Sequence, residues 1–138
     1  MQPPVEPAAS QAPRKPRILV VEDERLIRVT LRQTLALHDF EVLVAANAIE
    51  GRTLFDQCEE IDLVLADMIL PGKSGTELAS ELLVAQPGLR VLFMSAYSRE
   101  LLLQQGRITQ DQCTLEKPFT EDTLLSAVYE MLGQRGRG

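Results

Sequence analysis

The chain has 138 residues, of which 45% are hydrophobic and 25% charged, a balance typical of one folded globular domain and not of a disordered chain. Its net charge of −6 and aromatic content of 4% argue against nucleic acid as a ligand, because the chain repels phosphates and offers few rings for base stacking. No apolar run approaches the roughly 18 residues of a membrane span, and the start of the chain lacks the layout of a secretory signal. We therefore expect a cytoplasmic protein that does not insert into membranes.

The chain begins with a segment that we expect to be a disordered tail or linker. Residues 1–16 contain five prolines and show no apolar periodicity. A folded domain is predicted for residues 17–133, and residues 134–138 are expected to form a flexible end. The two cysteines, Cys58 and Cys113, lie far apart without neighbouring histidines, which indicates buried, reduced thiols and neither a zinc site nor a disulfide.

Strands and helices alternate five times along the predicted domain. The β-branched and leucine residues at 18–21 predict a strand buried on both faces, and a helical apolar repeat follows to about residue 38. The same patterns predict strands at 41–45, 63–67, 90–95 and 112–116, and helices at 48–58, 76–85 and 120–132. Residues 98–112 predict only a short or irregular helix, because Gly106 and polar residues follow the leucines. This alternation indicates an α/β fold, with a parallel sheet covered by helices on both faces.

Polar residues stand at the carboxyl ends of the predicted strands, where ligands bind in folds of this class. They are Glu22 and Asp23 after the first strand, Asp67 at the end of the third, Ser95 at the end of the fourth, and Lys117 after the fifth. Three carboxylates at one edge repel one another, by about 3 kcal/mol per pair at about 5 Å if the effective dielectric constant is near 20. A divalent cation with oxygen ligands is therefore expected, and Mg²⁺ suits a site with few carboxylates. Beside such an ion and the Lys117 ammonium, Asp67 can act as a nucleophile toward phosphorus, and the Ser95 hydroxyl can donate to a phosphoryl oxygen.

Each of these residues also has a purely structural interpretation. Acidic residues after a strand commonly stabilise the start of the following helix, Ser95 alone is typical of a loop hydroxyl, and Lys117 alone is typical of a solvated charge. Their joint presence favours the functional interpretation. The only histidine, His38, ends a predicted helix and is interpreted as structural, not as a phosphohistidine.

The motifs at these positions resemble the receiver domain of two-component response regulators, over roughly residues 17–133. Four motifs occur in the family's order, ILVVEDE at 18–24, LVLADMILPGKSG at 63–75, VLFMSA at 91–96 and LEKPF at 115–119. The resemblance implies a flavodoxin-like, doubly wound (βα)5 fold whose five-stranded parallel sheet has the order 2-1-3-4-5. Within the family, the chain is similar to receivers of hybrid sensor kinases and to stand-alone single-domain regulators.

The resemblance also implies a role for each residue of the site. Asp67 would take a phosphoryl group from a histidine kinase or a histidine phosphotransfer protein, and Ser95 and Lys117 would contact that group. The implied Mg²⁺ ligands are the carboxylates of Asp23 and Asp67, that of Glu22 largely through water, and the backbone carbonyl of Ile69. Lys117–Pro118 would be a cis peptide. The phosphorylated state would change binding of an unknown downstream protein or relay the phosphoryl group. We expect the chain to be a monomer. We expect it not to be an enzyme, since it would catalyse only its own phosphorylation and dephosphorylation.

Position 114 departs from the family pattern. Many receivers carry an aromatic residue three positions before the lysine, which swings inward on activation, but Thr114 occupies that position here. We hypothesise that Tyr97, two residues after Ser95, covers the site and tunes the lifetime of the phosphoryl group.

Two other functions stay open at the level of sequence. The first is a phosphorylation-independent interaction module on the same fold. The second is a hydrolase that forms an aspartyl-phosphate, although such an enzyme needs an acid two residues after the nucleophile, where Ile69 lies.

Overall fold

The structure, a computed structural model, describes residues 14–133. In this part of the chain, five parallel strands form one sheet in the order β2-β1-β3-β4-β5, which confirms the predicted fold. The strands are β1 (Arg17–Val21), β2 (Glu41–Ala45), β3 (Leu63–Asp67), β4 (Arg90–Ser95) and β5 (Cys113–Glu116). The helices are α2 (Arg25–Leu37), α3 (Ala48–Gln57), α4 (Gly75–Ala85), α5 (Arg99–Gln104) and α6 (Glu121–Met131). The predicted flexible end at 134–138 and the first thirteen residues of the predicted tail lie outside the described residues.

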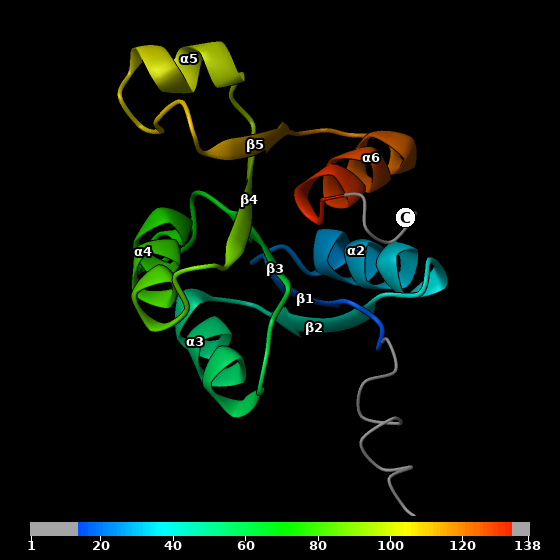
Figure 1. Cartoon of the computed structure of the whole chain (residues 1–138). Coiled ribbons are helices and arrows are strands. Elements are labelled where there is room, and N and C mark those ends of the chain that lie inside the picture. Colours follow the sequence, from blue (N-terminus) through cyan, green and yellow to red (C-terminus); the bar gives the residue numbers. More distant parts are fainter. Residues whose placement is uncertain (1–13, 134–138) are drawn as a thin grey trace, which may run out of the picture.

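The sheet lies between two layers of helices (Figure 1). Helices α2 and α6 cover one face, and α3 and α4 cover the other. Helix α5, which has only six residues, packs through Leu102 near Ala79 of α4 and Phe93 of β4, and this confirms the predicted short helix. The two faces of the sheet are thus both covered, as a parallel sheet requires.

Alternate residues of the central strands supply the two cores. Ile18 and Val20 of β1 pack on the side of α2 and α6, while Leu19 and Val21 pack on the side of α3 and α4, and all four are fully buried. Each such side chain contributes about 1.5–3 kcal/mol on burial. The continuous apolar run at 18–21 is therefore explained by a strand that has no solvent-exposed face.

Side chains cap four of the five described helices. The capping residues are Asn47 for α3, Ser74 for α4, Ser98 for α5 and Thr120 for α6, and each accepts a hydrogen bond from a backbone N–H of the first turn. The N-cap residue of helix α2 is Glu24, whose side chain makes no capping hydrogen bond. The start of α2 must therefore be fixed in another way.

The contacts of the domain extend a few residues before its predicted boundary. The Pro16 carbonyl accepts a hydrogen bond from the Glu41 N–H at 2.9 Å, and Arg14 forms ion pairs with Glu60 at 3.0 Å and Asp62 at 2.9 Å. These contacts lie at the amino-terminal edge of the sheet, opposite the edge that carries the predicted site.

One prediction about the cysteines is wrong. Cys58 is half-buried as a free thiol, but Cys113 is exposed. Cys113 is the first residue of β5, an edge strand with a neighbouring strand on one side only, so less of the protein covers it.

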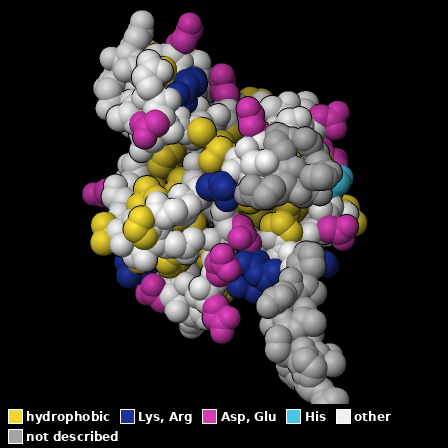
Figure 2. All heavy atoms as spheres, in the orientation of Figure 1, with side chains coloured by type: hydrophobic (Ala, Val, Ile, Leu, Met, Phe, Trp, Pro, Cys, Tyr) yellow, Lys and Arg dark blue, Asp and Glu magenta, His cyan; other side chains and the backbone are white. Residues whose placement is uncertain are grey.

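Acidic side chains are scattered over the face shown in Figure 2, and Lys and Arg side chains lie among them. Among residues 14–133, no helix combines the length and the apolar character needed to cross a bilayer.

Candidate functional site

Parallel pairing brings the predicted site residues to one edge of the sheet. Glu22 and Asp23 directly follow β1, Asp67 is the last residue of β3, Ser95 is the last residue of β4, and Lys117 directly follows β5. Since the carboxyl ends of these strands meet, residues separated by up to 95 positions in the chain come into direct contact.

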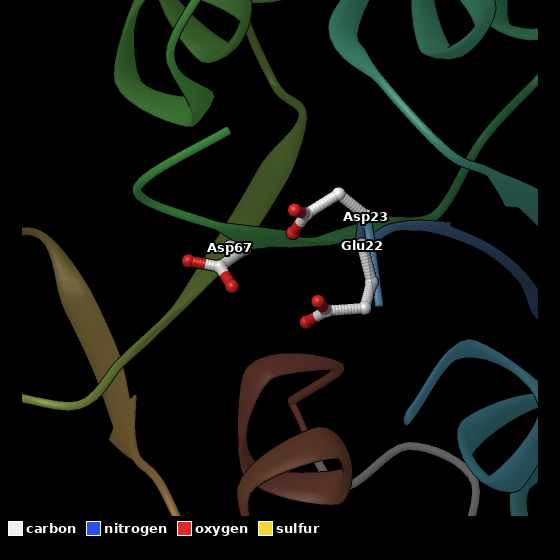
Figure 3. A group of neighbouring side chains, drawn as sticks. All are labelled: Glu22, Asp23 and Asp67. Atoms are coloured by element: carbon white, nitrogen blue, oxygen red, sulfur yellow. The ribbon is translucent and has the colours of Figure 1, made fainter. Parts of the chain in front are cut away.

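The three acids face a common space. Glu22, Asp23 and Asp67 each offer a carboxylate oxygen within 4.8 Å of the others. Figure 3 shows the side chains of Glu22 and Asp23 pointing toward the side on which Asp67 lies. Glu22 is fully buried, Asp67 is 9% exposed and Asp23 is exposed, so the cluster is open to solvent on the Asp23 side. All three donors are hard oxygens, without histidine or cysteine, and this donor set fits a hard divalent cation such as Mg²⁺.

Lys117 links two of the acids. Its Nζ lies 2.6 Å from Asp67 Oδ2 and 2.9 Å from Glu22 Oε1. Burial by itself lowers the pKa of Lys117, but hydrogen bonds and Coulomb attraction from Asp67 and Glu22 outweigh it, so the pKa lies above the usual lysine value. The lysine is therefore held as an ammonium beside the Asp67 carboxylate. The Lys117–Pro118 peptide is cis, as expected.

The surroundings of Glu22 raise its pKa. Burial raises the pKa of Glu22 above the usual value and the charge of Asp67 adds to this, while the Glu24 N–H and Lys117 act in the opposite direction. The Glu24 N–H and the Lys117 ammonium thus both favour the ionised form of this buried carboxylate.

The loop after β3 holds Asp67 from the other side. Asp67 Oδ1 accepts a hydrogen bond from the Ile69 N–H at 3.0 Å. Gly75, at the start of α4, packs directly against the backbone of Asp67, because a Cβ at position 75 would lie 2.0 Å from the Asp67 carbonyl oxygen. Position 75 therefore requires glycine, because any larger residue would prevent this close approach. The Ile69 side chain is exposed.

Ser95 lies at the same edge, but its hydroxyl contacts the backbone. Ser95 Oγ accepts a hydrogen bond from the Tyr97 N–H at 3.0 Å, and the Ser95 carbonyl accepts one from the Lys117 N–H at 2.7 Å. Within residues 14–133, no hydrogen bond joins the Ser95 hydroxyl to Asp67 or Lys117. Its own proton is thus not committed to either.

Tyr97 and Thr114 lie farther from the acids. Tyr97 is 43% exposed, and the guanidinium of Arg107 lies 5.9 Å from the centre of its ring. Thr114 is half-buried on β5, opposite Phe93 of β4 in the register of the sheet. The described contacts connect neither side chain with the three acids.

Two features of the site were not found from the sequence. An apolar groove of about 300 Å³ lies beside Lys117, and its lining includes Leu26, Ile27, Pro118 and Phe119. Leu26 belongs to the helical apolar repeat that precedes residue 38, but it is 79% exposed. The second feature is Arg28, whose guanidinium contacts the backbone carbonyls of Glu22 and Asp23. A cation in the first turn of a helix, where the dipole disfavours it, was the available signal.

Comparisons with known proteins agree with this geometry. The family model of the response regulator receiver domain matches residues 18–129. The chain is 30% identical over 116 residues to sporulation initiation phosphotransferase F of Bacillus subtilis (strain 168), a match that covers 84% of this chain and 93% of that protein. It is 28% identical over 116 residues to sensor kinase CckA of Brucella abortus (strain 2308), covering 83% of this chain but 12% of that longer protein.

Solved structures show the same likeness. The crystal structure of response regulator protein TrrA from Thermotoga maritima, in complex with Mg²⁺ and BeF, matches with a TM-score of 0.70 and 32% identity, covering 84% of this chain and 98% of that one. Fold, strand-end acids and family model therefore agree, and the chain belongs to the response regulator receiver domain family, the phosphoryl-accepting domains of two-component signalling.

Proposed function

We propose that Asp67 is the residue of this receiver, taken as residues 17–133, that accepts the phosphoryl group. The donor is a phosphohistidine on a histidine kinase or a histidine phosphotransfer protein, the classes of partner with which receiver domains work. The observation that carries the proposal is the position of the Asp67 carboxylate, 2.6 Å from Lys117 and within 4.8 Å of the carboxylate oxygens of Glu22 and Asp23.

In the proposed step, an Asp67 carboxylate oxygen attacks phosphorus as the phosphorus–nitrogen bond of the phosphohistidine breaks. The imidazole nitrogen keeps the bonding electron pair and takes up a proton. Lys117 offsets negative charge on the phosphoryl oxygens from the Oδ2 side. Water later hydrolyses the aspartyl-phosphate and restores the carboxylate, so the chain acts only on itself.

Receiver domains typically bind Mg²⁺ at an acidic pocket, and the oxygen donors of this site fit that ion. We assign direct ligands to Asp23, Asp67 and the Ile69 carbonyl, and a ligand through water to Glu22. When bound there, Mg²⁺ supplies positive charge that offsets the charge of the phosphoryl oxygens.

Ser95 and Tyr97 act after transfer in this proposal. The Ser95 hydroxyl accepts from the Tyr97 N–H and keeps its own proton available, so it can donate to a phosphoryl oxygen. Because the Tyr97 N–H donates to the Ser95 hydroxyl, a movement of that hydroxyl toward the phosphoryl group alters the position of Tyr97. Thr114 offers no ring to move, so we assign the tuning of phosphoryl lifetime to Tyr97.

The apolar groove beside Lys117 is the surface on which we place the phosphohistidine donor. A phosphohistidine reaches Asp67 only when its own protein lies against this edge of the sheet. Leu26 and Phe119 line the groove next to Lys117, and Leu26 exposes 79% of its surface. Phosphorylation then changes the binding of a downstream protein or passes the group onward.

Incubation with Mg²⁺ and acetyl phosphate, followed by intact mass measurement, tests the proposal. The wild-type chain should gain one base-labile phosphoryl group, Asp67→Asn should gain none, and Asp56→Asn, at an exposed aspartate of α3, should behave as wild type. Continuous release of phosphate at a high rate would indicate the hydrolase instead. No gain of mass and no turnover would indicate the phosphorylation-independent module.

A further inference from the structure

The N-cap residue of α2 does not cap that helix with its side chain. Glu24 occupies the N-cap position without a side-chain capping bond, and the first turn of α2 contains no acidic residue. The other four described helices all have a side-chain cap. The start of α2 therefore lacks the side-chain cap that the other described helices have.

Arg28 holds the segment before α2 in place of a cap. Arg28 lies in the first turn of α2, where its N–H donates to the Glu24 carbonyl at 2.9 Å. Its Nη1 donates to the backbone carbonyls of Glu22 at 2.8 Å and Asp23 at 3.2 Å. Helical side chains lean toward the amino end of their helix, so the guanidinium reaches back over the segment that precedes it. A cation at this end opposes the helix dipole, and its contacts with the two carbonyls offset that cost.

The two carbonyls belong to the residues whose carboxylates face Asp67. One guanidinium nitrogen bridges two successive peptide groups, and this restricts the directions in which the side chains of Glu22 and Asp23 can leave the backbone. The same turn is tied a second time, because Glu22 Oε2 accepts from the Glu24 N–H at 3.0 Å. Mobility in this turn would separate the carboxylates from Asp67.

We infer that Arg28 is a positioning residue of the cation site, which holds Glu22 and Asp23 so that their carboxylates converge on Asp67. The inference rests on the proposed function, because that function requires a cation site at Glu22, Asp23 and Asp67. The contact of Arg28 with Glu22 and Asp23 is made entirely through backbone carbonyls. Arg28 itself touches neither the carboxylates nor the phosphoryl group.

Charge and position predict opposite signs for the loss of Arg28. If Arg28 were only a nearby positive charge, its removal would strengthen binding of a cation. If Arg28 positions the acids, its removal weakens binding of the cation. The expected loss is roughly tenfold, which is typical of a residue that orients metal ligands without contacting the metal. The direction of the change therefore decides between the two.

The experiment is a titration of the full chain with MgCl₂, in which the changes of the amide chemical shifts give the Kd for Mg²⁺. Arg28→Ala should raise the Kd for Mg²⁺ by roughly tenfold. Arg28→Lys should lie between wild type and Arg28→Ala, because a lysine ammonium can replace the single nitrogen that makes both contacts. Arg32→Ala, an exposed arginine one turn farther along α2, controls for loss of charge and should change Kd by at most about twofold.

Amide hydrogen exchange in EDTA supplies a second measurement that needs no metal. Exchange at residues 23 and 24 should accelerate in Arg28→Ala, while exchange in β3 should not change. Wild-type protein that binds Mg²⁺, together with an Arg28→Ala variant that binds it equally or more tightly, would overturn the inference and leave the proposed function intact. Wild-type protein that binds no Mg²⁺ would overturn the cation site itself, and unchanged exchange at 23 and 24 would then also reject the hold of Arg28 on the segment.

Discussion

Replacing Lys117 by methionine should destabilise the metal-free protein. Methionine keeps much of the side-chain volume but removes the cation that contacts Asp67 and Glu22 at 2.6 and 2.9 Å. Removing one partner of a buried ion pair costs about 3–5 kcal/mol. Glu22 is fully buried but the Lys117 side chain is 20% exposed, so we reduce this figure to about 2–3 kcal/mol of unfolding free energy. The melting temperature should fall by roughly 6–12 °C.

The loss should depend on pH in a defined direction. Burial already raises the pKa of Glu22, and Lys117 counteracts that rise, so the pKa of Glu22 rises further in Lys117→Met. An acid whose pKa is raised on folding binds a proton more readily in the folded state, so stability increases as pH falls through the folded pKa. The destabilisation should therefore be largest above that pKa and should shrink below it.

Urea unfolding in EDTA, at pH 8 and at about pH 5, measures both effects. Lys73→Met is the matched control, because Lys73 forms an exposed ion pair with Glu81, and its loss should cost less than about 1 kcal/mol. Equal losses in the two variants, or a Lys117→Met loss that is the same at both pH values, would refute the reasoning.

Gly75→Ala should lower the unfolding free energy by about 3 kcal/mol in urea, because the added Cβ meets the β3 backbone, whereas Gly88→Ala, in open space, should change it little. Tyr97→Ala should shorten the lifetime of the phosphoryl group severalfold, measured as loss of base-labile mass over time, and an unchanged rate would reject its tuning role. Leu26→Ala should slow phosphoryl transfer from a histidine kinase that phosphorylates the wild-type chain, by roughly fivefold or more, but should not alter labelling by acetyl phosphate. Leu37→Ala, equally exposed at the far end of α2, should leave both reactions unchanged, and a slowing as large as that of Leu26→Ala would reject the groove as the docking surface.

The sequence was sufficient to predict the sheet and the position of the acids. The apolar run at 18–21 has only one stable environment, the centre of a sheet covered on both faces, and polar residues after such strands must meet at one edge. Asp67, Glu22 and Lys117 follow from that rule, and the structure brings them into contact.

The contacts within the site could not be predicted in the same way, because they depend on side-chain rotamers and on the approach of separate loops. The sequence predicts three crowded acids that need a metal ion. In the structure Lys117 already contacts two of them, Glu22 and Asp67. Likewise, the hydroxyl of Ser95 accepts a hydrogen bond from the Tyr97 N–H. This bond could be predicted only if the path of the chain after β4 were known.

The contacts of Lys117 make this lysine an internal counter-ion, present before any metal arrives. If the carboxylates bind a divalent cation as proposed, that ion would lie close to the ammonium that contacts Glu22 and Asp67. The ammonium would lower the affinity for the cation, because the two positive charges repel each other. A single substitution at position 117 should therefore act in opposite directions, making the metal-free fold less stable and its acidic edge a tighter binder of Mg²⁺.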